Sequence, residues 1–270
     1  MFSRSLVALF LASSFAACAA LSGCASPTDE EGDSADIPEE GISEDALASD
    51  RQLMGNELAD KTLSITFDDG PAGRSAELAD YLAAQGVQAT FFINGKSVGG
   101  HQAAIDTIIA RGHVLGNHTQ NHLQLTKLAP EKVVQEVAET DAFISRAHPE
   151  GPFLIRAPFG AWNSNTARAL NGSAMSKYVG SIFWDIGGEL TSTSAADWAC
   201  WSHGVSIEQC GDLYVNEIHT RRRGIVLMHD VHNKTVDMVK YIIPTLKAEG
   251  YRFVPLASVP SIKRAIGEAQ

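Results

Sequence analysis

The sequence predicts an α/β fold in which a mainly parallel sheet closes into one barrel-like domain. Short β-rich runs alternate with amphipathic helical segments between residues 62 and 256, a pattern typical of repeated strand–helix units. Six or seven such units follow one another over about 200 residues, which suits a barrel better than two separate domains. Apolar residues make up 44% of the chain, enough for a sizeable core.

Each expected element rests on a local pattern. A β-rich run over residues 62–67 precedes a polar turn, and a helix over 76–85 stops at Gly86. The long helix over 130–147 begins with a proline, which is favoured at the first helical position. The other expected strands are 89–93, 113–115, 153–156, 181–186, 224–228 and 252–256, and the other expected helices are 103–111, one between 156 and 181, and 235–248.

The first part of the chain has the pattern of an exported protein. Residues 6–20 are apolar but too short to span a bilayer comfortably, and they lead into Leu21-Ser22-Gly23-Cys24. This end resembles the lipobox of bacterial lipoproteins, so we expect a signal peptide over 1–23 and lipidation of Cys24. An ordinary secretory signal is the alternative. The expected location is therefore the cell envelope, with the protein anchored to the membrane.

An acidic segment follows. Residues 28–50 carry ten Asp or Glu and no Lys or Arg, and like-charged segments extend. We expect a flexible tether over 24–58 and the folded domain over 59–262. The formal charge of −11 belongs largely to the tether, because residues 51–270 hold 22 acidic and 20 basic residues. With no basic footprint, nucleic acid is not an expected partner.

Two cysteines remain in the expected domain. Cys200 and Cys210 would lie in an oxidising compartment, which favours a local disulfide. A zinc pair is the weaker alternative, because the spacing lacks the C-x-x-C form.

Asp68 and Asp69 follow the first expected strand directly. Adjacent carboxylates are costly inside a protein unless something compensates them. Gly70-Pro71 turns the chain after them, so both carboxylates can reach one cavity. A solvated turn is the alternative reading, because Asp-Asp-Gly is common turn chemistry.

His118 and His122 form the second candidate group. Two histidines four residues apart can share one face of a helical turn and converge on a cation. With one carboxylate they would form a two-His, one-carboxylate set that leaves coordination positions open for catalysis.

Two further segments end expected strands with reactive groups. Arg156 precedes Ala157-Pro158-Phe159-Gly160, an irregular loop whose backbone N–H groups could bind an oxyanion. His229 ends an apolar strand and can work as a general acid near neutral pH.

Together these segments resemble the ordered motifs of the polysaccharide deacetylase family, also called the NodB-homology domain or carbohydrate esterase family four. Residues 66–70 resemble its first motif, 118–122 its His-(Ser/Thr)-x-x-His motif, 156–160 its Arg-x-Pro-(Tyr/Phe)-Gly motif, and 227–229 its fifth motif. The resemblance covers roughly residues 60–257, and the motifs occur in the family's order.

The resemblance implies a distorted (β/α) barrel, a single catalytic domain of the NodB-homology type, and a divalent metal that is commonly zinc. Its ligands would be Asp69, His118 and His122. Asp68 would be the general base, Arg156 would restrain Asp68, and His229 would protonate the leaving amine. The Phe159 backbone N–H would stabilise the oxyanion, and Trp184 would contact substrate.

One motif departs from the family pattern. The fourth motif is typically Asp-x-x-Asp-Trp, and its first Asp tunes the catalytic histidine. Here Gly187 falls at that position, and Asp197-Trp198 appears only after extra residues. Glu189 or Asp185 are candidates to orient His229 instead. The residues around 191–212 are expected to form an insertion whose Trp198 and Trp201 could wall the substrate groove; a purely structural loop is the alternative.

The expected activity is removal of N-acetyl groups from a β-linked amino-sugar polymer such as peptidoglycan or a chitin-like glycan. An ester substrate such as acetylated xylan is a second possibility, because the altered motif affects the group that protonates an amine. A glycan-binding protein with an inactive site is the third. We expect a monomer whose partners are the polysaccharide and the membrane.

Overall fold

A computed structural model of the protein describes residues 48–267, with side chains placed from residue 51. The expected signal peptide, Cys24 and most of the expected tether lie outside these residues. Within the described residues, no helix is both long and apolar enough to cross a membrane.

The main sheet is parallel and has the order β4-β3-β2-β6, with the short β7 beside the first two residues of β2. Its strands are β2 (Thr62–Asp68), β3 (Ala89–Ile93), β4 (Val114–Asn117), β6 (Arg223–His229) and β7 (Arg252–Phe253). Every residue of β2 and β3 is buried, as expected for parallel strands covered on both faces.

A second, smaller sheet completes the barrel. It pairs β1 (Ala48–Leu53) with β5 (Gly180–Ile182) in parallel. Isolated bridges join the two sheets: Asn117 to Ile155, Leu154 to Val179, and Ile186 to Val226. The expected α/β fold with a distorted barrel in one domain is therefore confirmed.

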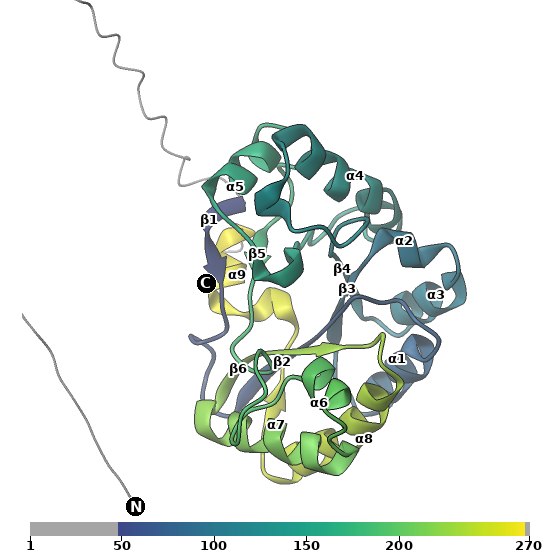
Figure 1. Ribbon diagram of the computed structural model, residues 1–270, viewed down its shortest axis with the longest axis vertical. Coiled ribbons are helices and arrows are strands. Elements are labelled where there is room, and N and C mark those ends of the chain that lie inside the picture. The colour runs from purple at the N-terminus through teal and green to yellow at the C-terminus, as the bar shows by residue number, and fades with distance from the viewer. Residues whose placement is uncertain (1–47, 268–270) are drawn as a thin grey trace, which may run out of the picture. The chain divides into compact units, whose positions relative to one another are not determined.

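The helices lie outside the strands (Figure 1). They are α1 (Ser75–Ala84), α2 (Gly95–Val98), α3 (Gln102–Ala110), α4 (Pro130–Ala147), α5 (Ser164–Asn171), α6 (Asp197–Ser202), α7 (Ile207–Arg221), α8 (Asn233–Ala248) and α9 (Pro260–Ala265). Helix α7 packs on α8, α1 on α3, and α4 on α5. Beneath them Phe67 and Phe91 stack with ring centroids 5.1 Å apart. Burying a side chain of this size contributes about 1.5–3 kcal/mol.

The structure corrects several expected boundaries. Strand β1 lies inside the range assigned to the tether, so the ordered part begins before residue 59, and α9 extends past residue 262. The strand expected over 153–156 is reduced to bridges, and that over 252–256 to two residues. Helix α7 was not expected, although Ser206 and Gln209 form a capping box that marks its start.

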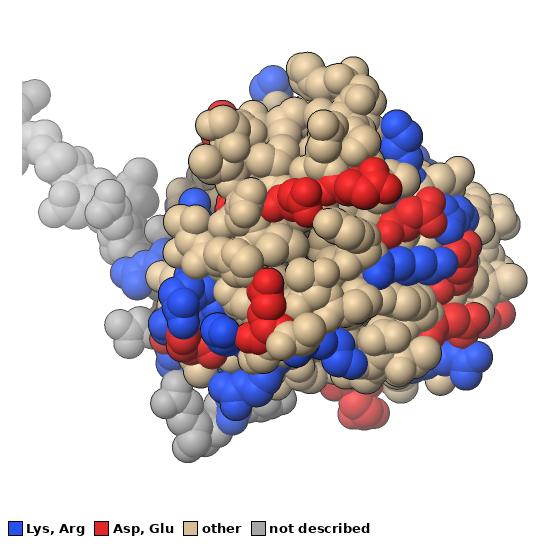
Figure 2. Space-filling view, turned by 90° about the horizontal axis from the view of Figure 1, so that it is seen from below, with Lys and Arg blue, Asp and Glu red and all other residues tan. Residues whose placement is uncertain are grey.

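Charges of both signs alternate on the face shown in Figure 2. Arg222 pairs with Asp60 at 2.5 Å, and Arg74 pairs with Asp237 at 2.7 Å. This face of the folded part is mixed in charge, in line with the nearly balanced composition of residues 51–270.

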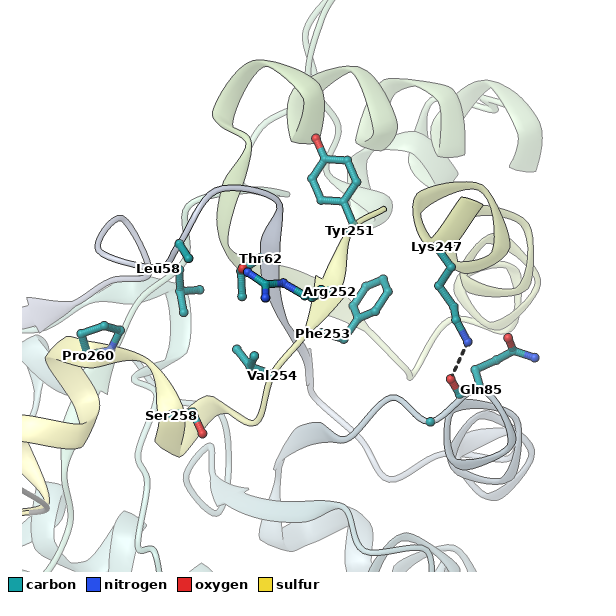
Figure 3. Close-up of a pocket in the computed structure, with 12 residues that line it drawn as sticks. Leu58, Thr62, Gln85, Lys247, Tyr251, Arg252, Phe253, Val254, Ser258 and Pro260 are labelled. Carbon is teal, nitrogen blue, oxygen red and sulfur yellow. Dashed lines mark hydrogen bonds between the residues drawn. The ribbon is translucent and has the colours of Figure 1, made fainter. Parts of the chain in front are cut away.

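A cavity of about 720 Å³ opens at the amino end of β2, between β7 and the last turns of α1 and α8 (Figure 3). Lys247 Nζ donates a hydrogen bond to the carbonyl oxygen of Gln85 across it, at 2.8 Å. None of the predicted site residues lines this cavity. Catalytic groups of parallel barrels lie at the opposite, carboxyl ends of the strands, and the candidate site is found there.

Candidate metal centre and catalytic groove

The side chains of the two adjacent aspartates point in different directions because strand β2 ends between them. Asp68 is the last residue of β2 and is buried, whereas Asp69 has φ +72° and is only half-buried. A positive φ is uncommon for a residue with a side chain. It turns the Asp69 carboxylate toward the histidines, while Asp68 stays in the barrel.

Asp69, His118 and His122 place their ligand atoms within 4.8 Å of one another. Asp69 Oδ1 lies 3.2 Å from His122 Nε2 and 3.5 Å from His118 Nε2. Two ligands of a tetrahedral zinc ion, each about 2.0–2.2 Å from the metal, lie about 3.3–3.6 Å apart. The donor set and its spacing therefore fit a small divalent cation.

The histidines converge through a loop, not through the helical turn that we expected. His118 and His122 follow β4, and Thr119 and His122 have φ values of +68° and +60°. The loop is held by buried Glu136 of α4, which accepts hydrogen bonds from the backbone N–H and side-chain amide of Asn121 at 2.8 and 2.9 Å. No motif pointed to Glu136.

Neighbouring groups fix the protonation that metal binding needs. His118 Nδ1 lies 2.8 Å from the carbonyl oxygen of Arg156. A carbonyl can only accept, so Nδ1 carries the hydrogen, and in the neutral ring Nε2 is the nitrogen with a lone pair for a cation. Burial raises the pKa of Asp69, but the positive charges that His118, His122 and His229 carry when protonated outweigh burial and leave that pKa below its usual value. Burial lowers the pKa of His122 and favours the neutral ring.

Arg156 holds Asp68 in place from inside the barrel. Its guanidinium is fully buried, and Nη1 donates to Asp68 Oδ1 and to Thr66 Oγ1, both at 2.8 Å. Its other nitrogens donate to the carbonyl oxygens of Ile182 and Phe183 at 3.2 and 3.1 Å. One carboxylate oxygen of Asp68 is thereby fixed, and the other, Oδ2, lies 3.7 Å from His118 Nε2.

His229 is oriented by Asp197, not by Glu189 or Asp185. His229 Nδ1 lies 2.7 Å from Asp197 Oδ1, and the His229 backbone N–H donates to Asp197 Oδ2 at 2.7 Å. Thr235 Oγ1 also donates to Asp197 Oδ2 at 2.7 Å. Burial lowers the pKa of His229, but Asp197 outweighs burial and, with smaller effects of Asp68 and Asp69, raises that pKa to about 9.

The two residues that we proposed for this task lie elsewhere. Asp185 Oδ2 accepts the backbone N–H groups of Gly55 and Ile225, both at 2.8 Å, and so ties three segments of the barrel together. Glu189 is exposed. The sequence signal for the true partner was present in Asp197-Trp198, the surviving half of the fourth motif.

The surroundings of Gly187 leave no room for the first aspartate of that motif. A Cβ at Gly187, which has φ +94°, would lie 2.2 Å from the Leu227 carbonyl oxygen and 3.0 Å from Tyr214 Oη. Tyr214 Oη donates to that carbonyl at 2.9 Å and accepts the Asp197 backbone N–H at 3.1 Å. The Leu227 carbonyl group and Tyr214 thus fill the space beside Gly187, and Tyr214 holds Asp197 at the start of α6.

The expected disulfide is present. Cys200 and Cys210 are bonded and join α6 to the first turn of α7. Trp198, on α6, is 48% exposed and lines the groove, as expected. Trp201 does not, because its indole Nε1 donates to Thr235 Oγ1 at 3.0 Å and its ring packs on the core.

These groups line a cavity of about 510 Å³ at the carboxyl end of the barrel. Phe159, 68% exposed, stands with its ring centroid 4.6 Å from that of His122. Trp184 is half-buried and stacks on Phe183. The lining residues are Asp68, Asp69, His118, His122, Ala157, Phe159, Trp184, Gly188, Trp198, Leu227, His229 and His232.

Comparison with known proteins agrees with this arrangement. Residues 55–176 match the family described as polysaccharide deacetylase. A peptidoglycan-N-acetylglucosamine deacetylase of Bacillus cereus is 30% identical over 206 residues, which cover 74% of this chain and 88% of that protein. The chain belongs to the polysaccharide deacetylase family. The family match ends before Trp184, Asp197 and His229, so the places of those residues come from the geometry alone.

Two further relatives show how much of the chain is similar to known proteins. The peptidoglycan-N-acetylglucosamine deacetylase PgdA of Listeria monocytogenes is 28% identical over 209 residues, 77% of this chain, and this chain spans only 41% of its length. The crystal structure of the Bc1960 peptidoglycan N-acetylglucosamine deacetylase superposes with a TM-score of 0.61 at 27% identity, covering 77% of this chain and 91% of that one.

Proposed function

We propose that the protein is a metal-dependent hydrolase that removes N-acetyl groups from a β-linked amino-sugar polymer, peptidoglycan or a chitin-like glycan. The observation that carries the proposal is the placement of three kinds of group around one cavity. The cavity is lined by the candidate metal triad, by the Asp68 carboxylate, which Arg156 restrains, and by the His229 imidazole, which Asp197 keeps protonated.

Asp69, His118 and His122 would hold the cation, for which zinc is our first choice. A divalent cation there would polarise the acetyl carbonyl and lower the pKa of water. Asp68 accepts the proton of the attacking water at Oδ2, because Arg156 occupies its other oxygen. A carboxylate pinned on one side can serve as base without joining the ligand set.

His229 supplies the second proton. With a pKa of about 9 it is protonated near neutral pH. Asp197 accepts from Nδ1, so Nε2–H remains to protonate the sugar nitrogen as the carbon–nitrogen bond breaks. The products are acetate and a free amino sugar. The altered fourth motif left an ester substrate as an alternative because it left His229 without an evident partner, and the contact with Asp197 weakens that alternative.

The rim of the groove suits a sugar polymer. Phe159, Trp184 and Trp198 present aromatic faces around the catalytic groups. Flat apolar surfaces beside a few polar groups are what oriented ligand sites use. Two of the relatives are named for peptidoglycan, which supports that polymer as the first substrate to test.

The test is acetate release from N-acetylated chito-oligomers and from isolated peptidoglycan, with zinc added or with a chelator. Acetate should appear with zinc, fall on chelation, and be lost in the isosteric Asp68→Asn variant. An acetylated xylan run in parallel separates ester from amide cleavage. If neither amide substrate yields acetate under any metal condition, the proposed reaction is wrong; binding without turnover that survives Asp68→Asn would favour the inactive glycan-binding reading.

We further propose that Cys24 is lipidated and anchors the protein in the cell envelope. The support is the sequence Leu21-Ser22-Gly23-Cys24 after an apolar stretch. Wild-type protein should sediment with membranes, and a Cys24→Ser variant should be recovered in the soluble fraction. Equal sedimentation of both proteins would argue against the anchor.

A further inference from the structure

Asp230 follows His229 at the end of β6 and has no role in the reaction just described. Its carboxyl group is buried, and Oδ1 has no hydrogen-bond partner among the described residues. Leaving a buried polar atom unpaired costs about 1–3 kcal/mol. The presence of the Asp230 carboxyl group despite this cost therefore needs an explanation.

The carboxyl group of Asp230 lies against the loop that carries Asp69. A Cβ built on Gly70 would lie 2.3 and 2.4 Å from the two carboxylate oxygens of Asp230. Gly70 is therefore required here because the carboxyl group fills the space that a side chain would take. Asp230 and the residue next to Asp69 are in direct contact.

A hydrogen-bond chain extends this contact along the loop. Ser75 Oγ donates to Asp230 Oδ2 and accepts the backbone N–H of Ala72, the latter at 2.8 Å. Ser75 is fully buried at the start of α1. On its other side the loop is held by the backbone N–H of Asn94, which donates to the Gly70 carbonyl oxygen at 2.9 Å.

We propose that Asp230 is a positioning residue that fixes the Asp69 loop against the strand carrying His229. The hydrogen bonds that link Asp230 to Ser75 and Ser75 to Ala72 set where the Asp69 carboxylate lies relative to the two histidines. One buried carboxyl group thus joins the loop beside the candidate metal site to the end of the strand that carries His229. This inference rests on the proposed metal site.

The experiment measures zinc affinity of the full chain by competition with a chromogenic chelator. Asp230→Ala should weaken zinc binding by about 10- to 100-fold, the usual effect of removing a group that supports a ligand. Asp230→Asn keeps the size of the side chain and an acceptor for Ser75, so it should restore affinity to within about threefold of wild type. Ser75→Ala, which breaks the link to Ala72, should show an intermediate loss.

Asp185→Ala is the matched control. It also removes a carboxylate that ties separate segments together, but this half-buried carboxylate accepts the backbone N–H groups of Gly55 and Ile225. It should lower thermal stability and leave zinc affinity unchanged. If Asp230→Ala binds zinc as tightly as wild type does, the inference is wrong. It is also wrong if Asp185→Ala weakens zinc binding as much as Asp230→Ala does. Neither result affects the proposed metal site. Wild-type protein that binds no zinc overturns the proposed metal site and the inference with it.

Discussion

Asp197 holds His229 at two points, with Oδ1 at 2.7 Å from the ring nitrogen Nδ1 and Oδ2 at 2.7 Å from the backbone nitrogen. The first contact stabilises the charged ring, and the second fixes the end of β6. Asp197 is itself fully buried, and although burial raises its pKa, His229 and Thr235 bring that pKa below its usual value. The pair therefore exists as carboxylate and imidazolium near neutral pH.

Replacing Asp197 with Asn should remove the charge that keeps His229 protonated. The pKa of His229 is raised by Asp197, so it should fall in the variant, and the alkaline limb of the pH–rate profile should move to lower pH. Above neutral pH the loss should be large, about 100- to 10,000-fold in kcat, because the acid is then unprotonated. Glu189→Gln is the control and should leave the profile unchanged. An unshifted alkaline limb in Asp197→Asn would refute this role.

The sequence predicted the parts of the site that lie where strands end. Asp68, Asp69 and His229 each follow or end an apolar run, and strand ends of a parallel barrel meet on one face. The partner of His229 was not predictable in the same way. Asp197 comes from a short helix that follows β5 after a segment without helix or strand, and its place depends on Tyr214 and Thr235, which are distant in sequence.

Gly187→Ala should destabilise the protein, because position 187, where the fourth motif of the family has its first Asp, has no room for a side chain. The methyl group would have to sit 2.2 Å from the Leu227 carbonyl oxygen, in a backbone conformation that side chains rarely adopt. The strain and the overlap should lower the unfolding free energy by about 2 kcal/mol or more. Chemical denaturation measures this, with Gly86→Ala as the control, because Gly86 also has a positive φ, +66°, but no atom lies within 4 Å of a Cβ added there. Retained stability in Gly187→Ala would mean that the backbone at Leu227 can shift to make room for the methyl group.

Arg156→Met should destabilise the protein mainly through Asp68. The change leaves a buried carboxylate without its cation, and breaking such a pair costs about 3–5 kcal/mol. The double variant Arg156→Met with Asp68→Asn has no buried charge left unpaired and should recover most of that stability while staying inactive. Denaturant titration of both single variants and the double variant gives the coupling energy. Additive losses would show that Arg156 acts through its other partners, the carbonyl groups of Ile182 and Phe183.

Removing the disulfide should affect the reaction as well as the fold, because α6 carries Asp197. The double variant Cys200→Ser with Cys210→Ser opens a loop of 10 residues and should lower the unfolding free energy by about 2–3 kcal/mol. Tyr214 and Thr235 still hold Asp197 by hydrogen bonds, so kcat should fall by less than in Asp197→Asn, while the alkaline limb of the pH–rate profile moves in the same direction. Turnover and denaturation are measured on the same preparation, below the unfolding transition of the variant. A stability loss with an unchanged pH–rate profile would show that the disulfide only ties α6 to α7 and does not set the position of Asp197.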